Sequence, residues 1–199
     1  MKKTSIITAA ILCIAFASCQ TAKQDPASSI TALLIIPSSD VQDDELTVTK
    51  TVLENSGIKA VVAGKEKKPV NGMLGGTFEP DIAVADANPS DYSMIVFIGG
   101  NGAFGLYDDA QIHSMIRTFD EQGKIIAAIC AAPGILANAG VLSGKEATCY
   151  PYEPISNLLT EKGAVYLDKP VVVSGRVITG NGAEASEAFA GALIKAVQG

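Results

Sequence analysis

The sequence predicts an α/β fold with a mostly parallel β-sheet covered by helices on both faces. Short runs rich in Ile and Val recur without polar alternation, as in strands that are buried on both faces. Stretches with helical periodicity lie between several of these runs. The length of 199 residues and the hydrophobic content of 48% suit one globular domain with an extension.

The expected elements follow one another along the chain. Strands are predicted at residues 32–37, 58–63, 94–98, 125–129, 171–173 and 177–179. Helices are predicted at residues 42–55, 106–122, 133–139 and 183–197. The glycine- and proline-rich stretch 69–87 is predicted to form an excursion at one sheet edge, with a small hairpin as one possibility. Chemistry is expected at the carboxyl ends of the strands.

Composition excludes several classes of function. Fifteen basic and 21 acidic residues give a formal charge of −6, which disfavours binding to nucleic acid. The four cysteines form no C-x-x-C pair, and His113 is the single histidine. We therefore expect no metal centre.

The N-terminus is predicted to direct export. Lys2 and Lys3 precede an apolar run at residues 6–17, which is too short to span a bilayer but suits a secretory signal. Small residues before Cys19 resemble a bacterial lipobox, which implies a signal peptide at 1–18, an acylated Cys19 and a tether through residue 29. The alternative is an ordinary signal peptide cut near Ala17. The first reading predicts a membrane-anchored lipoprotein that faces the periplasm or the cell surface, with a folded domain at 30–199.

A glycine-rich turn follows the predicted strand 94–98. Residues 100–105 spell G-N-G-A-F-G, a G-x-G-x-x-G pattern between a strand and a helix. A dinucleotide site also requires an acid after the next strand, but Cys130 stands there. A similar G-N-G-A turn at 180–183 favours tight turns as the role of these glycines. No cofactor is expected.

Cys130 is the candidate nucleophile. It lies between the buried strand 125–129 and a helix that we expect to start at Pro133. A thiol at a helix N-terminus is expected to have a pKa below the free value. Small residues after it suit a strained nucleophile turn. The alternative is a buried cysteine that packs as a small hydrophobic residue.

The chain resembles the ThiJ/PfpI superfamily, which includes the Parkinson-disease-associated protein deglycase. The resemblance starts near Thr31 and is carried by residues 56–64, 88–92, 99–100, 124–133 and 144–151. It implies a flavodoxin-like three-layer sandwich with a mostly parallel sheet, like class I glutamine amidotransferases. It also implies a homodimer and a reactive cysteine bonded to a carboxylic acid.

The resemblance also assigns the surroundings of the cysteine. It places the acid at Glu45, which in protonated form can donate a hydrogen bond to the sulfur. The backbone N–H groups of Gly100 and Ala131 are the implied oxyanion-binding pair. For the neighbouring Asp43 and Asp44, the simpler role of complementing a helix N-terminus is preferred.

Departures from the family pattern limit the expected chemistry. Peptidase-like members carry histidine at the position of Ala131, and others carry it at the position of Tyr150, so proteolysis is not expected. Tyr150 is left as an auxiliary residue. Cys149 is interpreted as a buried apolar residue or as a thiol that captures oxidised Cys130. We expect the two cysteines to lie too far apart for a disulfide.

Two functions remain open from the sequence. In the first, Cys130 attacks a small carbonyl compound such as a 2-oxoaldehyde, with Glu45 moving the proton, as in a glyoxalase or deglycase. In the second, Cys130 is oxidised without turnover, and the protein is redox-responsive or a binding protein. A scaffold that has lost its chemistry is the third alternative.

Overall fold

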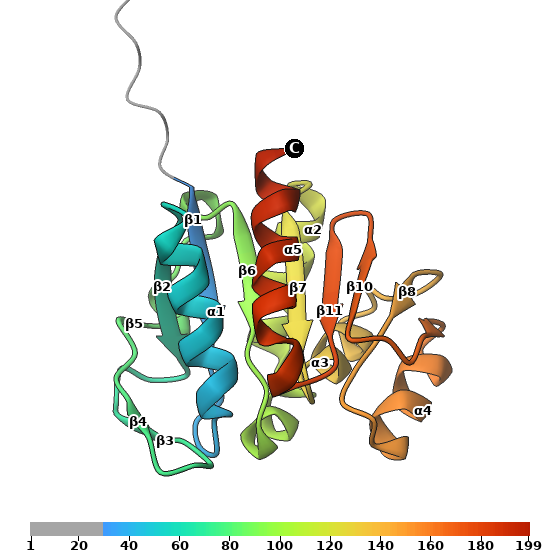
Figure 1. Cartoon of the computed structure of the whole chain (residues 1–199), viewed down its shortest axis with the longest axis horizontal. Coiled ribbons are helices and arrows are strands. Elements are labelled where there is room, and N and C mark those ends of the chain that lie inside the picture. The colour runs from blue at the N-terminus through green and yellow to red at the C-terminus, as the bar shows by residue number, and fades with distance from the viewer. Residues whose placement is uncertain (1–29) are drawn as a thin grey trace, which may run out of the picture.

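The computed structural model describes residues 30–199, which form a three-layer α/β sandwich (Figure 1). The central sheet has seven strands in the order β10-β11-β7-β6-β1-β2-β5. Its strands are β1 (Thr31–Ile35), β2 (Lys59–Gly64), β5 (Ile82–Ala83), β6 (Met94–Phe97), β7 (Ile125–Ile129), β10 (Val171–Ser174) and β11 (Val177–Gly180). The predicted class, a flavodoxin-like sandwich, is confirmed.

The pairing of the strands is parallel except at one edge. β1 pairs with β2 and β6, β6 with β7, and β7 with β11, all in parallel, whereas β10 pairs with β11 in antiparallel orientation. The chain runs first to β2 on one side of β1 and later to β6 on its other side. In α/β sheets, ligands bind at such a reversal, outside the carboxyl ends of the strands. These ends lie at the bottom of Figure 1.

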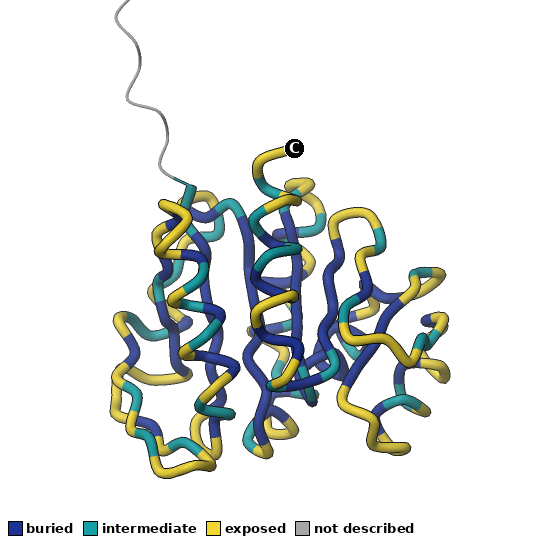
Figure 2. The backbone as a smooth tube through the Cα atoms, viewed as in Figure 1, coloured by how far each residue is buried: buried dark blue, intermediate teal, exposed yellow. Residues whose placement is uncertain are grey.

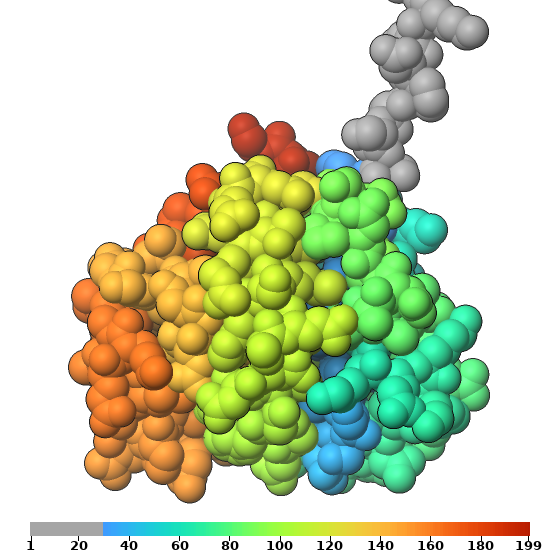
Figure 3. Space-filling model, turned by 180° about the vertical axis from the view of Figure 1, so that it is seen from behind, coloured from blue at the N-terminus to red at the C-terminus, as the bar shows by residue number. Residues whose placement is uncertain are grey.

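Helices cover both faces of the sheet, as predicted. α1 (Asp43–Asn55) and α5 (Ser186–Gln198) lie on one face. α2 (Ala110–Glu121) and α3 (Pro133–Asn138) lie on the other, where α2 is yellow-green in Figure 3. The strands between them are buried on both sides, which explains why β1, β6 and β7 read as unbroken apolar runs (Figure 2).

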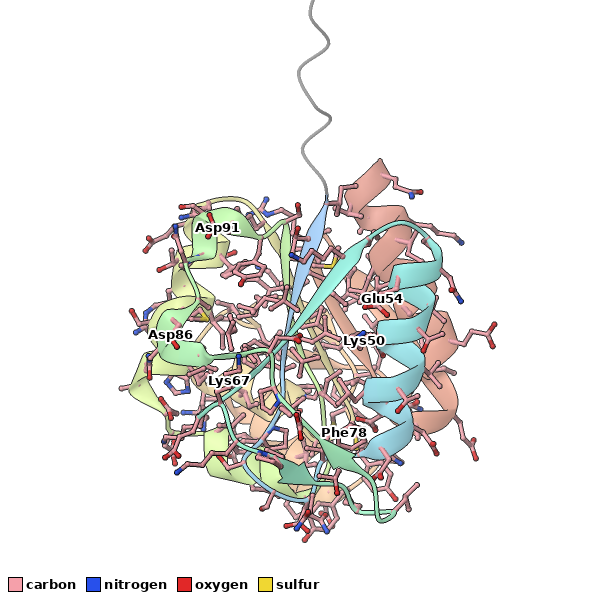
Figure 4. The ribbon with its side chains drawn as sticks, turned by 90° about the vertical axis from the view of Figure 1, so that its left-hand side faces the viewer. Lys50, Glu54, Lys67, Phe78, Asp86 and Asp91 are labelled. Atoms are coloured by element: carbon pink, nitrogen blue, oxygen red, sulfur yellow. The ribbon has the colours of Figure 1, made fainter. Side chains whose placement is uncertain are left out.

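The stretch 69–87 forms the small hairpin that was one of the possibilities. β3 (Val70–Asn71) and β4 (Thr77–Phe78) pair in antiparallel orientation, and β5 then joins the edge of the main sheet beside β2. Phe78 packs against the core on the α1 side of the sheet (Figure 4). The hairpin therefore lies at the carboxyl end of the sheet, close to the start of α1.

Residues 140–170 contain elements that were not predicted. A short parallel pair, β8 (Glu146–Ala147) and β9 (Val165–Tyr166), flanks α4 (Glu153–Glu161). Elsewhere in residues 30–199 there are four 3-10 helices that were not predicted, η1 (Val84–Asp86), η2 (Pro89–Asp91), η3 (Asn101–Leu106) and η4 (Ala183–Ala185). The helices predicted at 106–122 and 183–197 are therefore shorter α-helices, with 3-10 turns before them.

The predicted signal peptide, the lipidated Cys19 and the tether lie outside the described residues. Within residues 30–199, no helix is both long enough and apolar enough to cross a bilayer.

Asp43 fastens the hairpin to the start of α1. Its Oδ2 accepts the N–H of Leu74 at 2.8 Å, and its Oδ1 accepts the N–H of Gly76 at 2.7 Å. A side chain at Gly72 would collide with the same carboxylate, at 2.4 Å from its oxygens. Asp43 thus stabilises a loop distant in sequence, a more specific role than complementing the helix.

Replacing this carboxylate is expected to loosen the hairpin. Asp43→Ala leaves two backbone N–H groups without their charged acceptor, which we expect to lower the free energy of unfolding by about 1–3 kcal/mol. Hydrogen exchange should show faster exchange at Leu74 and Gly76. Asp44→Ala is the matched control because Asp44 is exposed. Equal exchange in both variants would contradict the assignment.

Candidate functional site

Three strand ends meet at the crevice and bring the predicted site together. Glu45 lies in the first turn of α1, after β1, and Gly99 and Gly100 follow β6. Cys130 follows β7 directly. Because β1, β6 and β7 are adjacent and parallel, residues separated by 85 positions in the chain converge at one edge of the sheet. The sequence prediction for the location of Cys130 and Glu45 agrees with this arrangement.

The backbone of Cys130 has the sparsely populated conformation expected of a nucleophile turn. Its φ is +63°, and Asp40 is the only other non-glycine residue with positive φ in residues 30–199. Two hydrogen bonds hold it there: its N–H donates to the carbonyl of Gly180 at 2.9 Å, and its carbonyl accepts the N–H of Tyr150 at 2.7 Å. The turn directs the side chain away from the strand and into the crevice.

Two backbone amides point at the sulfur. The N–H groups of Gly100 and Ala131 donate hydrogen bonds to the Cys130 side chain. Gly100 has φ +104°, and a Cβ at that position would lie 2.1 Å from the carbonyl oxygen of Asp40. Only glycine can therefore bring this amide to the site. The pair can stabilise negative charge on the sulfur or on an oxygen bound next to it.

Glu45 supplies the acid. Its side chain is fully buried, its Oε2 accepts the N–H of Gly99 at 3.0 Å, and its carboxyl group is hydrogen-bonded to the Cys130 side chain. The other oxygen, Oε1, meets no N–H or O–H donor among residues 30–199. The side-chain oxygen of Gln42 caps α1 by accepting the N–H groups of Asp44 and Glu45, which fixes the start of the helix.

Burial dominates the acid–base properties of the pair. It raises the pKa of Glu45 from an ordinary value of 4.5 to about 7, against the lowering effects of the Cys130 and Gly99 hydrogen bonds. Burial, reinforced by the charge on Glu45, also raises the pKa of Cys130, although the amides of Gly100 and Ala131 lower it. The expectation that this thiol has a pKa below the free value is wrong, because burial and the charge on Glu45 outweigh the two amides. The helix that was expected to lower the pKa, α3, has only six residues.

The two groups behave as a coupled pair. When the first proton leaves, the remaining proton can reside on either the sulfur or the carboxyl group. With the proton on Glu45, the like charge disappears and the carboxyl group can donate a hydrogen bond to the thiolate. An ionised Glu45 raises the pKa of the thiol, so protonation of Glu45, together with the two amides, favours the nucleophilic form of the sulfur.

Tyr107 is a site residue that sequence reasoning missed. Its hydroxyl donates to the carbonyl oxygen of Ala131 at 2.7 Å, and its ring fills the space beside Gly134, where a Cβ would lie 2.2 Å from it. It thereby positions the peptide that follows Cys130. The backbone carbonyl oxygen of Tyr107 accepts a hydrogen bond from Nδ2 of Asn138. The same oxygen lies 2.8 Å from Nε2 of His113. His113 is thus partly buried and does not line the crevice.

The auxiliary residues lie in different environments. Tyr150 is half exposed at the crevice. Cys149 is fully buried, and burial raises its pKa to about 12. Both Cys130 and Cys149 are free thiols. Whether Cys149 captures oxidised Cys130 stays open, and their separation stays a prediction.

The crevice is a pocket of about 460 Å³, large enough for a small organic substrate. Its walls come from the hairpin, α1, η3, the Cys130 turn and the segment before α4. The lining residues are Gln42, Glu45, Met73, Gly100, Asn101, Phe104, Cys130, Ala131, Tyr150, Tyr152, Ile155 and Ala183. Within residues 30–199, no group of three or more His, Cys, Asp or Glu side chains could hold a metal ion.

A cysteine with positive φ at a strand end, hydrogen-bonded to a buried acid, is typical of α/β proteins with a nucleophile turn. Comparison with known proteins identifies the class more narrowly. The model of the DJ-1/PfpI family matches residues 31–196, and the chain belongs to this family.

Similar proteins support the assignment. The chain is 32% identical to "Glutathione-independent glyoxalase DJR-1.2" of Caenorhabditis elegans, over 87% of this chain and 91% of the relative. It is 29% identical to a deglycase of Pyrococcus abyssi, over 74% and 87%. Among solved structures, a ThiJ/PfpI domain protein from Brachyspira murdochii has a TM-score of 0.81 at 28% identity, covering 84% and 96%. The structure of Drosophila melanogaster DJ-1beta has a TM-score of 0.76 at 32% sequence identity, and the match covers 85% of this chain and 94% of that one.

The raised pKa of Glu45 predicts a specific dependence of stability on pH. Between about pH 4.5 and 7 the unfolded chain has lost the Glu45 proton while the folded chain keeps it. The contribution of Glu45 to the free energy of unfolding is therefore greatest below pH 4.5. It falls as the pH rises through 7, by about 3 kcal/mol in all. Glu45→Gln, which cannot ionise, should remove this decline.

Urea unfolding at a series of pH values measures the effect. Asp44→Asn serves as the control, because it also removes one carboxylate but from an exposed position next in the chain. The same decline in wild type and Glu45→Gln would show that Glu45 is ionised throughout this range.

Proposed function

We propose that this protein is a cysteine-dependent enzyme that converts small reactive carbonyl compounds, in the manner of a glyoxalase or deglycase, in the cell envelope. The observation that carries the proposal is the hydrogen bond between the buried Glu45 carboxyl group and Cys130, with the amides of Gly100 and Ala131 directed at the same sulfur. Nucleophile, proton carrier and oxyanion donors thus lie in one pocket.

The first step is addition of the sulfur to the aldehyde carbon of a 2-oxoaldehyde. A C–S bond forms, the π electrons of the carbonyl group move to its oxygen, and that oxygen takes the proton of Glu45. The product is a hemithioacetal on Cys130. The Gly100 and Ala131 amides stabilise the charge that develops on oxygen during the attack.

The second step is a transfer of hydrogen between neighbouring carbons. Glu45, now a carboxylate, removes the proton from the sulfur-bearing carbon and returns a proton to the adjacent ketone carbon. The hydroxyl proton of the hemithioacetal moves to the former ketone oxygen, and the result is the thioester of a 2-hydroxy acid. Water then cleaves the thioester, releases the acid and restores the thiol, so that no outside oxidant or reductant is consumed.

The single acid of the site suits this reaction better than peptide hydrolysis. A peptidase must protonate a poor amine leaving group, for which a histidine beside the cysteine is the usual donor. Ala131 and Tyr150 stand at the two family positions for that histidine, and His113 lies behind Tyr107. The names of the worm glyoxalase and the archaeal deglycase support carbonyl chemistry for this chain.

A redox-responsive protein is the second candidate. The observation that favours it is the same pair of amides together with a protonatable Glu45, which suits the oxygens of a sulfinic acid on Cys130 as well as an oxyanion. A solved relative is described as "Toxoplasma gondii DJ-1, oxidized", at 29% identity.

The envelope location rests on the sequence of the first 19 residues. A basic start, an apolar run and small residues before Cys19 support cleavage and acylation at that cysteine. The lipid would bind the domain to a bilayer through the tether. The homodimer implied by the family resemblance also stays a prediction.

Turnover of methylglyoxal tests the enzyme proposal. Wild type should form lactate in large molar excess over protein, because the cysteine is regenerated in each cycle. Cys130→Ser should reduce the rate to that of buffer, and Glu45→Gln should lower kcat by about 10²–10⁴-fold, the usual contribution of a general acid–base group.

The matched control is Cys149→Ala, which removes a buried thiol beyond the pocket lining and should retain turnover. Loss of methylglyoxal without lactate, limited to one equivalent per protein, would refute the enzyme. Conversion of Cys130 to a sulfinic acid by mild peroxide, read by mass spectrometry in such an inactive protein, would make redox response the function.

Anchoring is tested in the native host with the full chain. We expect wild type in the membrane fraction, released by detergent but not by high salt. Cys19→Ser should be soluble or retain its signal peptide, and Cys13→Ser is the control because Cys13 lies inside the apolar run. A wild-type protein that lacks the lipid mass on its first peptide would contradict the proposal.

A further inference from the structure

The mouth of the Cys130 pocket is apolar and aromatic. Met73, Phe104, Tyr150 and Tyr152 are large side chains that remain roughly half exposed, and all four line the pocket. They come from the hairpin, η3 and the segment before α4, which are separate parts of the chain. Phe104 also packs against Tyr107, with ring centroids 5.2 Å apart. Exposed apolar side chains gathered around one opening indicate a surface for an apolar ligand.

Residues 30–199 contribute no basic side chain to the lining of the same pocket. None of its lining residues is Lys or Arg, and neither residue type occurs within two positions of any of them in the sequence. The charged sequence neighbours are all acidic: Asp40, Asp43, Asp44, Glu153 and Glu184. Glu45, the acid that is hydrogen-bonded to Cys130, is itself one of the lining residues of the pocket. An anion that entered would leave water, find no opposite charge and approach a carboxylate.

The backbone amides do not remedy this lack. The N–H groups of Gly100 and Ala131 already donate to the sulfur of Cys130. During the attack they are required for the carbonyl oxygen, so they cannot also serve a carboxylate or phosphate elsewhere on the substrate. Charged carbonyl compounds therefore meet no opposite charge among the lining residues of this pocket.

We propose that the pocket selects uncharged carbonyl compounds with an apolar or aromatic substituent and discriminates against carboxylated or phosphorylated ones. The inference rests on the proposed function insofar as these compounds are substrates. The selectivity itself is a property of the pocket and applies to any electrophile that reaches Cys130. Phe104 and Tyr152 contact the substituent, and the absence of a cation excludes the anions.

Alkylation of Cys130 tests the charge selectivity without turnover. Iodoacetamide and iodoacetate have nearly the same shape, and with each the thiolate forms a C–S bond while iodide leaves. The ratio of their rates at Cys130, followed by mass spectrometry above the pKa of Glu45, is compared with the ratio for N-acetylcysteine amide. We expect the preference of Cys130 for the neutral iodoacetamide to exceed that of N-acetylcysteine amide at least about tenfold, the effect that one nearby like charge in a protein pocket would produce. Equal ratios would overturn the proposal.

Two lysine variants separate the pocket from the net charge of the protein. Met73→Lys places a cation in the lining, whereas Leu74→Lys adds the same charge to the next residue of the loop, which is exposed and outside the lining. Met73→Lys should lower the rate ratio about three- to tenfold, and Leu74→Lys should leave it near that of wild type. Equal effects of the two variants would assign the selectivity to the overall charge and overturn the proposal.

Substrate comparison tests the apolar half of the inference. The value of kcat/KM should be higher for phenylglyoxal than for glyoxylate, and Phe104→Ala should lower it for phenylglyoxal about three- to tenfold more than for methylglyoxal, the size of a lost aromatic contact. An equal loss for both would overturn the role of Phe104. If no carbonyl compound is turned over but the alkylation selectivity is found, the proposed function fails while the pocket inference stands.

Discussion

The site depends on two ionisable groups, the carboxyl group of Glu45 and the thiol of Cys130, which lie against one another in a largely buried position. Burial disfavours ionisation of both groups, and the charge on Glu45 further raises the pKa of Cys130, although the hydrogen bond with Cys130 lowers the pKa of Glu45, so the pair is costly unless the surrounding backbone holds it. Gly99 shows how close the packing is. A Cβ there would lie 2.6 Å from the Cys130 Cβ and 2.7 Å from Glu45 Oε2, so glycine leaves the space in which the two side chains meet.

The fold provides this placement through its topology. The connection after β1 leads to β2 on one side of β1, whereas β6 lies on its other side. The connections at the carboxyl ends therefore diverge, and the start of α1 faces the end of β7. The positive φ of Cys130 then turns its side chain toward that helix. The macrodipole of α3, which first suggested an activated thiol, has little part in this, since the helix is short. The amides of Gly100 and Ala131 stabilise negative charge on the sulfur instead, whereas burial and the charge on Glu45 oppose it.

The sequence was sufficient to predict the parts of this arrangement that arise from local patterns. Unbroken apolar runs predicted the buried strands, and the strand–cysteine–small-residue pattern located the turn at Cys130. The pairing of Glu45 with Cys130 came from family resemblance, because no local pattern links positions so far apart. Tyr107 was missed for the same reason: its contact with Ala131 exists only after η3 and the Cys130 turn pack together. α4 was missed because its buried face consists of two residues, Ile155 and Leu159, which are too few to establish a helical period. The ionisation of the thiol was predicted incorrectly because burial cannot be read from a motif.

The hydrogen bond from the Cys130 N–H to Gly180 has a consequence for synthesis of the chain. Gly180 ends β11, which is made only after 50 further residues follow the cysteine. Until β11 pairs with β7, the turn lacks one of its two backbone restraints, and α5, which covers β7 and β11, has not yet been made. The nascent chain therefore carries Cys130 without this restraint for at least those 50 residues of elongation, and the turn is completed only late in synthesis. Premature termination before β11 would leave a protein with Glu45, Gly100, Cys130 and Ala131 but without the strand that restrains the turn.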